Sequence, residues 1–423
     1  MRRLLSPLPS LLFLALFTFV GYVPSAQATT YVMVSDENLA RQADVIAVVR
    51  VASVELSPVS ERPATDVQVE VERAVQGNLP GSSLVIRVPG GVRGNLGLKI
   101  WGAPEFKVGD RALVFLHPQT DGSFSILHLM LGAFLEVPWN GRSIAARNLD
   151  DAGELIPAGR EKASAEARRP RDFQRFVNWL EDRALGRPRD PDYFFTPEAG
   201  VPTRFTFLTS QGFKIRWFEF DRGQSVTWRS NSAGQEGVTG GGHAEFQRAL
   251  SAWNADGGTN INYGYGGQTT AAGGLDNFDD VNAILFNNTL NSPYDCNTGG
   301  VLAIGGPWFD PDVRETYRGE SYIVAQGGDI ATNSGLACFF GSSSDGSAAA
   351  EELFSLASNN PGANPAANPA AGHRARLRHR LLSGGIDALG DHEVIEYLLM
   401  RAIPRKDVKP IARSLLQRYG SLA

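Results

Sequence analysis

Short runs of β-branched and alternating apolar residues, separated by Gly, Pro, Asn and Asp, fill residues 29–160. Each run has the length and period of a β-strand, and strands at this spacing are typical of a small barrel or sandwich. One helical turn is expected at ENLARQA, residues 37–43. The predicted strands are DVIAVVRVASVEL, TDVQVEVERAV, SSLVIRVPG, RALVFLHP and FSILHLMLGAFLEV.

Residues 161–200 are charged and rich in proline, and they contain one helical pattern, RDFQRFVNWLEDRAL. Phe173, Phe176, Val177 and Leu180 recur at the spacing of a single helix face. We interpret this segment as a linker whose helix docks on a neighbouring domain.

The pattern changes again in residues 201–357. VTWRS, at 226–230, has the pattern of a strand, and GGHAEFQRALSAWNADGG has that of an amphipathic helix. This order, a strand followed by a helix and then more strands, predicts an α/β layout around a twisted mixed sheet. The four strands expected after the helix are INYGYGG, VNAILFNN, VLAIGGPWF and SYIVAQGGDIATN.

Helical periodicity returns in AAAEELF, residues 348–354, and then stops in a repeat of Asn, Pro and Ala. Each Pro removes a helical N–H donor and costs a helix about 3 kcal/mol, so residues 358–371 are expected to be a flexible linker. Three short helical patterns follow in residues 372–423 and predict a small all-α bundle. The fold class is therefore expected to be multidomain α+β.

The start of the chain has the three parts of a secretory signal. Two arginines precede an apolar run at 11–20, and the small residues Ala26 and Ala28 stand before Thr29. We expect residues 1–28 to be cleaved and the mature protein to be periplasmic or secreted, with no stable membrane anchor. An uncleaved anchor is the alternative, but the apolar run is short for a bilayer span.

Charge and cysteine content add two constraints. The formal net charge is −5, but residues 372–423 carry ten Lys and Arg against five Asp and Glu, which leaves −10 on everything before them. Cys296 and Cys338 are the two cysteines, and an oxidising compartment would favour a disulfide between them. Such a bond would add roughly 4 kcal/mol on a chain-entropy estimate. Two free buried thiols are the alternative.

Two segments resemble known families in the order of their elements. Residues 29–160 resemble OB-type or netrin-type barrels in layout. Residues 201–357 resemble the amino-terminal half of matrixin-like metzincin metalloproteases, on VTWRS, AEFQRALSAWN and GDIATN. In that family the next helix carries HExxHxxGxxH, in which three histidines hold zinc and the glutamate is the general base.

No HExxH occurs in this chain. The resemblance therefore implies a metzincin-like sheet with its backing helix but without the zinc helix, no catalytic residues, and no retained zinc. Without the zinc helix, one face of the sheet would be uncovered. Its apolar side chains would either be exposed to water, where they could bind protein partners, or pack on a short helix at 348–357.

Two other groups of residues contain side chains of the kind that bind metals. Asp276, Asp279 and Asp280 lie together in GLDNFDDVN and suit calcium, but we favour the interpretation that they form a solvated acidic turn. His392 and Glu396 are four residues apart on an expected helix, but one helix supplies only two ligands and the spacing identifies no third.

The tail closely resembles the amino-terminal helix-hairpin-helix region of RadC-type proteins, which are described as DNA repair proteins. RLRHRLLSGGIDALGDHEVIEYLL and DVKPIARSLLQRYGSL carry the resemblance. It implies contacts between backbone N–H groups or arginines and the phosphates of DNA, independent of base sequence. The JAMM-like metal domain of that family is not expected here. The candidate DNA-binding residues are Arg374, Arg376, Arg378, Arg380, Gly384, Gly385, Gly390, Arg405 and Lys406.

Three functions are consistent with these features. The first is an exported matrixin-like protein that lacks proteolytic activity and carries a RadC-like region. The second is a nucleic-acid-associated protein that acts through its tail, although a signal peptide would separate the tail from the chromosome. The third is a gene fusion, frameshift or assembly chimera without a single function.

Overall fold

The computed structural model contains the predicted barrel, docking helix and mixed sheet. The predicted signal at 1–28 and the predicted RadC-like tail lie outside the described residues. The structure describes residues 29–60, 62–139, 141–149, 151–157, 159–187, 189–195, 214–255, 260–290, 292–341 and 346–358.

The expected small barrel is present and is closed by five strands. They follow the order β7-β2-β3-β4-β8, and β8 pairs with both β4 and β7. Alternate side chains point inward, so valines such as Val49, Val67 and Val114 fill the interior. The strands are β2 (Val45–Leu56), β3 (Ala64–Gln76), β4 (Ser83–Pro89), β7 (Arg111–Pro118) and β8 (Phe124–Ile126).

A short extension continues this sheet beyond β7. Strands β9 (Ala133–Trp139), β10 (Arg142–Ala146) and β12 (Arg171–Asp172) follow one another there. The predicted docking helix is α3 (Phe173–Ala184), whose N-cap Asp172 accepts a hydrogen bond from the N–H of Arg175. Its four predicted apolar residues are all buried, and the helix packs against β3 and β10.

The second sheet has the predicted order of one strand, one helix and four strands. Its order in space is β17-β18-β16-β14-β15; β17 is antiparallel to β18, and the other four strands are parallel to one another. The mixed sheet expected for residues 201–357 is therefore present. The elements are β14 (Val226–Asn231), α4 (His243–Asn254), β15 (Tyr263–Thr269), β16 (Ala283–Asn288), β17 (Gly300–Tyr317) and β18 (Glu320–Asn333).

Strands from the amino-terminal segment complete this second sheet. β1 (Thr29–Val32) lies between β11 (Ala152–Glu154), to which it is parallel, and β17, to which it is antiparallel. β6 (Leu96–Leu98) also pairs with β17 and forms a hairpin with β5 (Gly91–Arg93). The segments 29–160 and 201–357 thus share one sheet, and β13 (Ile215–Arg216) adds a short pairing with β18.

Close contact between β6 and β17 requires a glycine. A Cβ on Gly306 would lie 1.8 Å from the carbonyl oxygen of Lys99. Since no side chain fits in that space, the glycine allows the chain leaving β6 to cross β17 directly.

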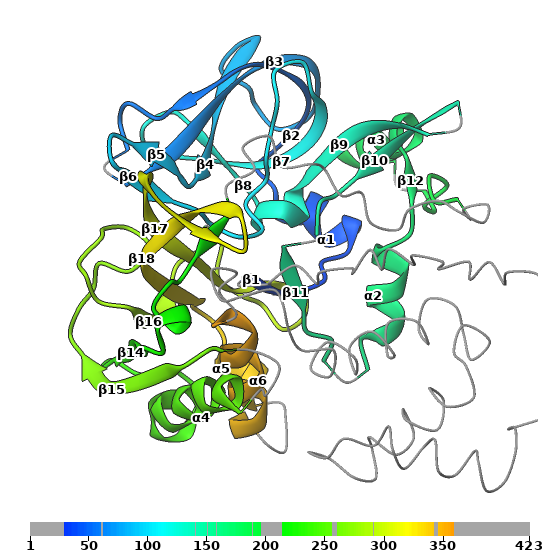
Figure 1. Ribbon diagram of the computed structural model, residues 1–423. Helices are drawn as coiled ribbons and strands as arrows, with labels where there is room; N and C mark the ends of the chain where they lie inside the picture. Colours follow the sequence, from blue (N-terminus) through cyan, green and yellow to red (C-terminus); the bar gives the residue numbers. More distant parts are fainter. Residues whose placement is uncertain are drawn as a thin grey trace, which may run out of the picture.

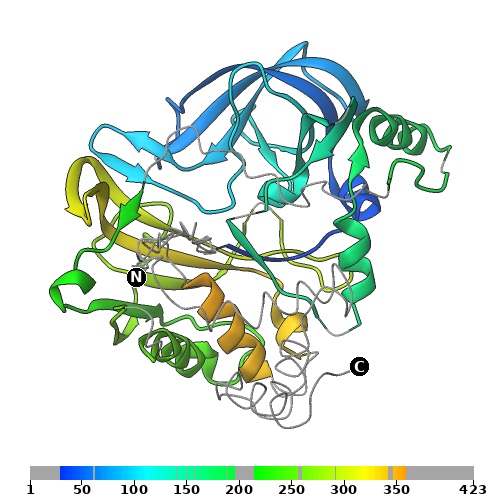
Figure 2. The same ribbon diagram turned by 45° about the vertical axis from the view of Figure 1, so that its right-hand side comes forward.

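Both faces of the central strands are covered. On one face Trp308 and Ala331 pack into the same core as barrel residues such as Phe115. On the other face Trp228 packs with Phe246 of α4 and Phe354 of α6 (Gly346–Ala357). Figures 1 and 2 show the barrel and the helices α4 and α6 on opposite sides of the sheet.

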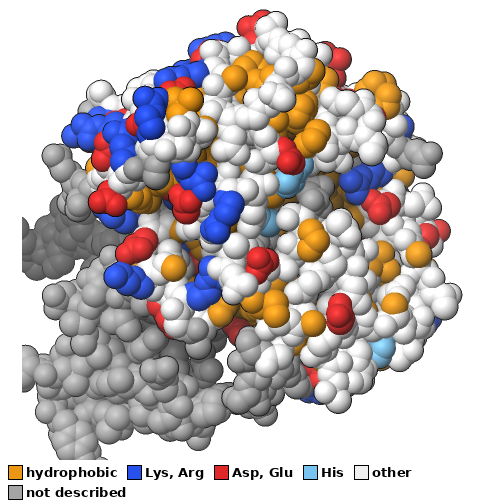
Figure 3. Space-filling view, turned by 180° about the vertical axis from the view of Figure 1, so that it is seen from behind, with side chains coloured by type: hydrophobic (Ala, Val, Ile, Leu, Met, Phe, Trp, Pro, Cys, Tyr) orange, Lys and Arg blue, Asp and Glu red, His pale blue; other side chains and the backbone are white. Residues whose placement is uncertain are grey.

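The sequence predicted that the sheet face without a zinc helix would either be exposed or pack on the short helix near residues 348–357. The structure shows that it packs on this helix, α6. Seen from behind in Figure 3, hydrophobic side chains of the described surface form small groups among charged and polar ones. The remaining described α-helices are α1 (Asp36–Gln42), at the expected helical turn, α2 (Glu161–Ala167) and α5 (Ala337–Gly341). None of the described helices is long and apolar enough to span a bilayer.

Candidate functional site

The predicted DNA-binding residues, from Arg374 to Lys406, lie outside the described residues. The DNA interface therefore stays a prediction.

The acidic loop before β16 does not bring its three carboxylates together. Asp276 forms an ion pair with Arg62 of the barrel. Asp279 accepts hydrogen bonds from the N–H groups of Gly273 (3.2 Å) and Val281 (3.0 Å). The part of the chain that the structure describes contains no group of three or more His, Cys, Asp or Glu side chains able to hold a metal ion. Calcium binding by Asp276, Asp279 and Asp280 stays a prediction.

Cys296 and Cys338 form a disulfide bond that links the loop before β17 to α5. Arg160, which immediately precedes the segment predicted as a linker, also contacts this loop. Its guanidinium donates hydrogen bonds to the carbonyl oxygens of Cys296 (3.0 Å) and Thr298 (3.3 Å). Gln42 donates a further hydrogen bond to the Thr298 hydroxyl, at 2.8 Å. Elements from three parts of the sequence thus fix this loop.

A buried ion pair ties α1 to the linker. Arg171 donates two hydrogen bonds to the Asp36 carboxylate, at 2.8 and 2.9 Å, and both residues are less than 5% exposed. The Tyr193 hydroxyl donates to the same carboxylate at 3.0 Å, and burial with the Asp36 charge raises the pKa of Tyr193. The Arg171 guanidinium also lies over the rings of Phe134 and Phe176.

A second arginine shares this cluster without a carboxylate partner of its own. Arg147 donates to the backbone carbonyl of Ala167 at 2.6 Å, and its guanidinium lies 4.7 Å from the centre of the Phe134 ring. Burial, with a smaller contribution from the positive charge of Arg171, lowers the pKa of Arg147 to about 9. Asp36 therefore balances only part of the positive charge in this core.

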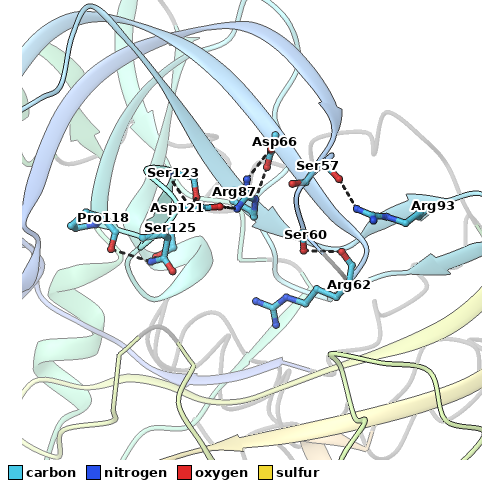
Figure 4. A network of polar contacts seen from close by, with 11 residues as sticks. Ser57, Ser60, Arg62, Asp66, Arg87, Arg93, Pro118, Asp121, Ser123 and Ser125 are labelled. Atoms are coloured by element: carbon cyan, nitrogen blue, oxygen red, sulfur yellow. Dashed lines mark hydrogen bonds and ion pairs between the residues drawn. The ribbon is translucent and has the colours of Figure 1, made fainter.

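A partly exposed network closes one side of the barrel. Arg87 donates to both oxygens of Asp66, at 2.7 and 3.0 Å, and also pairs with Asp121. Figure 4 shows Arg87 between the two carboxylates. The Ser123 hydroxyl, and next Arg87, hold the pKa of Asp121 down at about 2. The network joins β3 and β4 to the turn before β8, so its evident role is to hold these strands together.

Asp329, in the second half of β18, is a buried carboxyl. It is 3% exposed, and its two oxygens accept hydrogen bonds from the Ala283 N–H (3.0 Å) and the Trp308 indole N–H (2.9 Å). Burial raises its pKa to about 7, and the nearby Asp279 charge acts in the same direction. The neutral and ionised forms of this carboxyl are therefore balanced near neutral pH.

Two other arrangements have the appearance of sites but are better explained by packing. The Ser230 hydroxyl lies 2.9 Å from Nδ1 of His243 and 2.8 Å from the Tyr265 hydroxyl, but Ser230 is fully buried. It fixes the start of α4 on the sheet. A surface recess of about 420 Å³ between α1 and α3 contains arginines, all of them paired with carboxylates. Its walls are Glu37, Trp179, Arg183, Gly186 and Arg189.

Comparisons with known proteins concern a small part of the chain. No model of a protein family matches it. It is 56% identical over 45 residues to a UPF0758 protein of Rhodobacter capsulatus, which is 11% of this chain and 21% of the relative. A UPF0758 protein of Ruegeria pomeroyi is 56% identical over 47 residues, covering 11% of this chain and 21% of the relative.

A third relative, a UPF0758 protein of Fusobacterium nucleatum, is 49% identical over 49 residues, which is 12% of this chain and 21% of that protein. These relatives belong to the RadC family. The chain contains a RadC-like region. It spans about a fifth of the length of the curated relatives it matches, and the matches give no support to the matrixin-like resemblance.

The buried charges were not identified from the sequence. Arg171 follows a charged, proline-rich stretch and has the local appearance of a solvent-exposed residue. Asp329 could have been identified as a buried charge, because a single carboxylate inside the run SYIVAQGGDIATN is unusual for a buried strand.

Proposed function

We propose that the chain is an exported protein in which residues 201–357 are a matrixin-like domain without proteolytic activity, and which carries the RadC-like region after that domain. The observation that supports this most directly is the position of α6. Leu353 and Phe354 of this helix are fully buried on the sheet, and the helix carries Glu351 and Glu352 but no histidine. The helix therefore contributes to the core and offers no ligand set for zinc.

Proteolysis by the purified full chain tests this proposal. We expect no cleavage of a casein substrate with added zinc, and less than one zinc ion for every ten chains by elemental analysis. A matrixin-type enzyme serves as positive control under the same conditions. Cleavage that stops with a chelator and returns with zinc would show that the module is a protease.

We also propose that the RadC-like region binds DNA, and that this region is residues 372–423. Identity of 49–56% to UPF0758 proteins over 45–49 residues and the excess of basic residues in the tail support it. Contacts with phosphates release counterions, so binding weakens steeply as salt rises.

Duplex binding by the full chain is measured from low to physiological salt. We expect replacement of Arg374, Arg376, Arg378 and Arg380 by alanine to weaken binding at least tenfold and to reduce the salt slope by about one for each lost phosphate contact. The control removes the same charge from four exposed arginines of the described region. Equal loss in the two variants, or binding insensitive to salt, would exclude the tail as the interface. The control positions are Arg142, Arg175, Arg187 and Arg314.

A further inference from the structure

The Cys296–Cys338 disulfide joins a loop to the core of the mixed sheet. Cys338 belongs to α5, and Phe340 of the same helix is 1% exposed and packs in one core with Phe354 of α6. Cys296 lies in the tip of the loop before β17, which we define as residues 295–299. The disulfide therefore ties this tip covalently to the side of the sheet that α6 covers.

The tip is attached on its other side to the amino-terminal part of the chain. Gln42 of α1 and Arg160 both donate hydrogen bonds to Thr298, at 2.8 and 3.3 Å. Gly299 packs so closely against the end of β1 that a Cβ on it would lie 2.7 Å from the carbonyl oxygen of Met33. The tip thus connects the amino-terminal elements to α5, and the disulfide is the covalent part of that connection.

Strand β1 pairs with the residues that directly follow the tip. Two of its three pairs with β17 are to Gly300 and Val301, the first two residues of that strand. The register shifts between Thr30 and Tyr31, so the pairing is short and interrupted. All four residues of β1 are nevertheless buried. A movement of the tip would therefore act on a strand that has few pairs and is closed to solvent while they last.

Other contacts of the loop do not involve the disulfide. Inside the tip, the N–H groups of Asn297 and Gly299 donate to Asp295, each at 2.8 Å. The residues on either side of the tip are attached to the end of β18 and to α5. These attachments are hydrogen bonds from Asn333 to Ser292 (2.9 Å) and Val301 (2.8 Å), one from Tyr294 to Ser334 (2.9 Å), and a ring contact between Tyr294 and Phe339. Breaking the disulfide therefore loosens the tip itself and leaves the base of the loop in place.

The two cysteines differ in exposure. Cys338 is exposed, whereas Cys296 is partly buried. Exposed disulfides are reduced more readily than buried structural ones and include those with a regulatory role. A reductant in solution therefore reaches Sγ of Cys338 first.

We propose that this disulfide is a redox-sensitive lock, which in its oxidised form holds the tip, and with it β1, on the mixed sheet. The partner that opens it is a dithiol. One thiolate of the dithiol attacks Sγ of Cys338 and breaks the S–S bond, and Cys296 leaves as a thiolate that takes up a proton. The second thiol of the dithiol then resolves the mixed disulfide. The dithiol is thereby oxidised by two electrons to a disulfide, and both cysteines become thiols.

Reduction of the folded full chain tests the lock. The oxidised protein is treated with excess dithiothreitol without denaturant, and hydrogen exchange before and after reduction is followed by mass spectrometry. We expect exchange in β1 and the tip to rise about tenfold, because a cross-link between cysteines 42 residues apart contributes more than the corresponding free energy. A disulfide that resists dithiothreitol, or a rise in β1 of less than about threefold, would overturn the proposal.

Barrel strand β3 is the internal control for this experiment. Its exchange should change less than about twofold on reduction, since the lock acts on the tip and β1 and not on the barrel. An equal rise in β3 and β1 would mean that the disulfide stabilises the whole fold, and would also overturn the proposal.

Three serine variants make the test specific. In Cys296→Ser the free thiol is Cys338, and we expect it to react with an aromatic disulfide reagent about tenfold faster than the Cys296 thiol of Cys338→Ser. Equal rates would contradict the site of attack. The chain has only these two cysteines, so dithiothreitol should not affect the double variant. Its β1 should exchange as in the reduced protein, and exchange as slow as in the oxidised protein would overturn the lock. If the double variant does not fold, reduction of the native chain decides.

Discussion

Replacing Asp36 by alanine is expected to lower the free energy of unfolding by about 3–5 kcal/mol, because it leaves Arg171 buried without its carboxylate partner. Arg147 lies in the same cluster, near the same Phe134 ring, so two guanidinium groups would then share it without the Asp36 carboxylate. The loss is measured on the full chain by urea unfolding, followed by tryptophan fluorescence.

Glu37 provides a matched control on the same helix. It pairs with Arg183 at the surface, where its side chain is 54% exposed, so Glu37→Ala should cost no more than about 1 kcal/mol. Replacing both Asp36 and Arg171 by apolar residues should cost less than Asp36→Ala alone, since no buried charge is then left unpaired. If Asp36→Ala costs no more than Glu37→Ala, the pair does not stabilise the fold as described.

Residues 201–360 expressed alone are expected to aggregate or to bind a hydrophobic dye, whereas residues 29–360 should be soluble and unfold cooperatively. In the fragment β17 loses both β1 and β6, and the core around Trp308 loses the barrel. The apolar surface exposed is therefore the face toward the barrel, while α6 still covers the other face.

Size-exclusion chromatography and calorimetry of the two proteins check this expectation. Co-expression of residues 29–200 with the fragment should restore solubility, because it returns the missing strands in trans. A monodisperse fragment that melts cooperatively by itself would mean that the sheet is complete without the amino-terminal strands.

The elements with strong local periodicity were predictable from the sequence. The barrel strands, the apolar face of α3 and the order of elements from β14 to β18 all follow from residues close together in the chain. The contribution of amino-terminal strands to the second sheet was not predictable. β5, β6 and β11 have three residues each, too few to show a period, and nothing in TTYV indicates a partner at residues 300–303.

Candidate chemistry was harder to predict than the fold. The Asp276, Asp279 and Asp280 cluster suggested a metal site because sequence proximity implies spatial proximity, but the loop directs Asp276 to the barrel and Asp279 to its own backbone. Asp36 and Arg171 are 135 residues apart, so their pairing depends on the complete tertiary structure. Residues in the RadC-like tail remain sequence-based predictions.

The position of β1 between β11 and β17 also sets the order in which the protein can fold. Thr30 pairs with Ala303, so this strand leaves the ribosome about 270 residues before its partner. The barrel can form early from local hairpins, but the first described strand, TTYV, lacks its β17 partner until most of the polypeptide has been made. Newly synthesised molecules are therefore expected to depend on a chaperone that shields this strand during the interval.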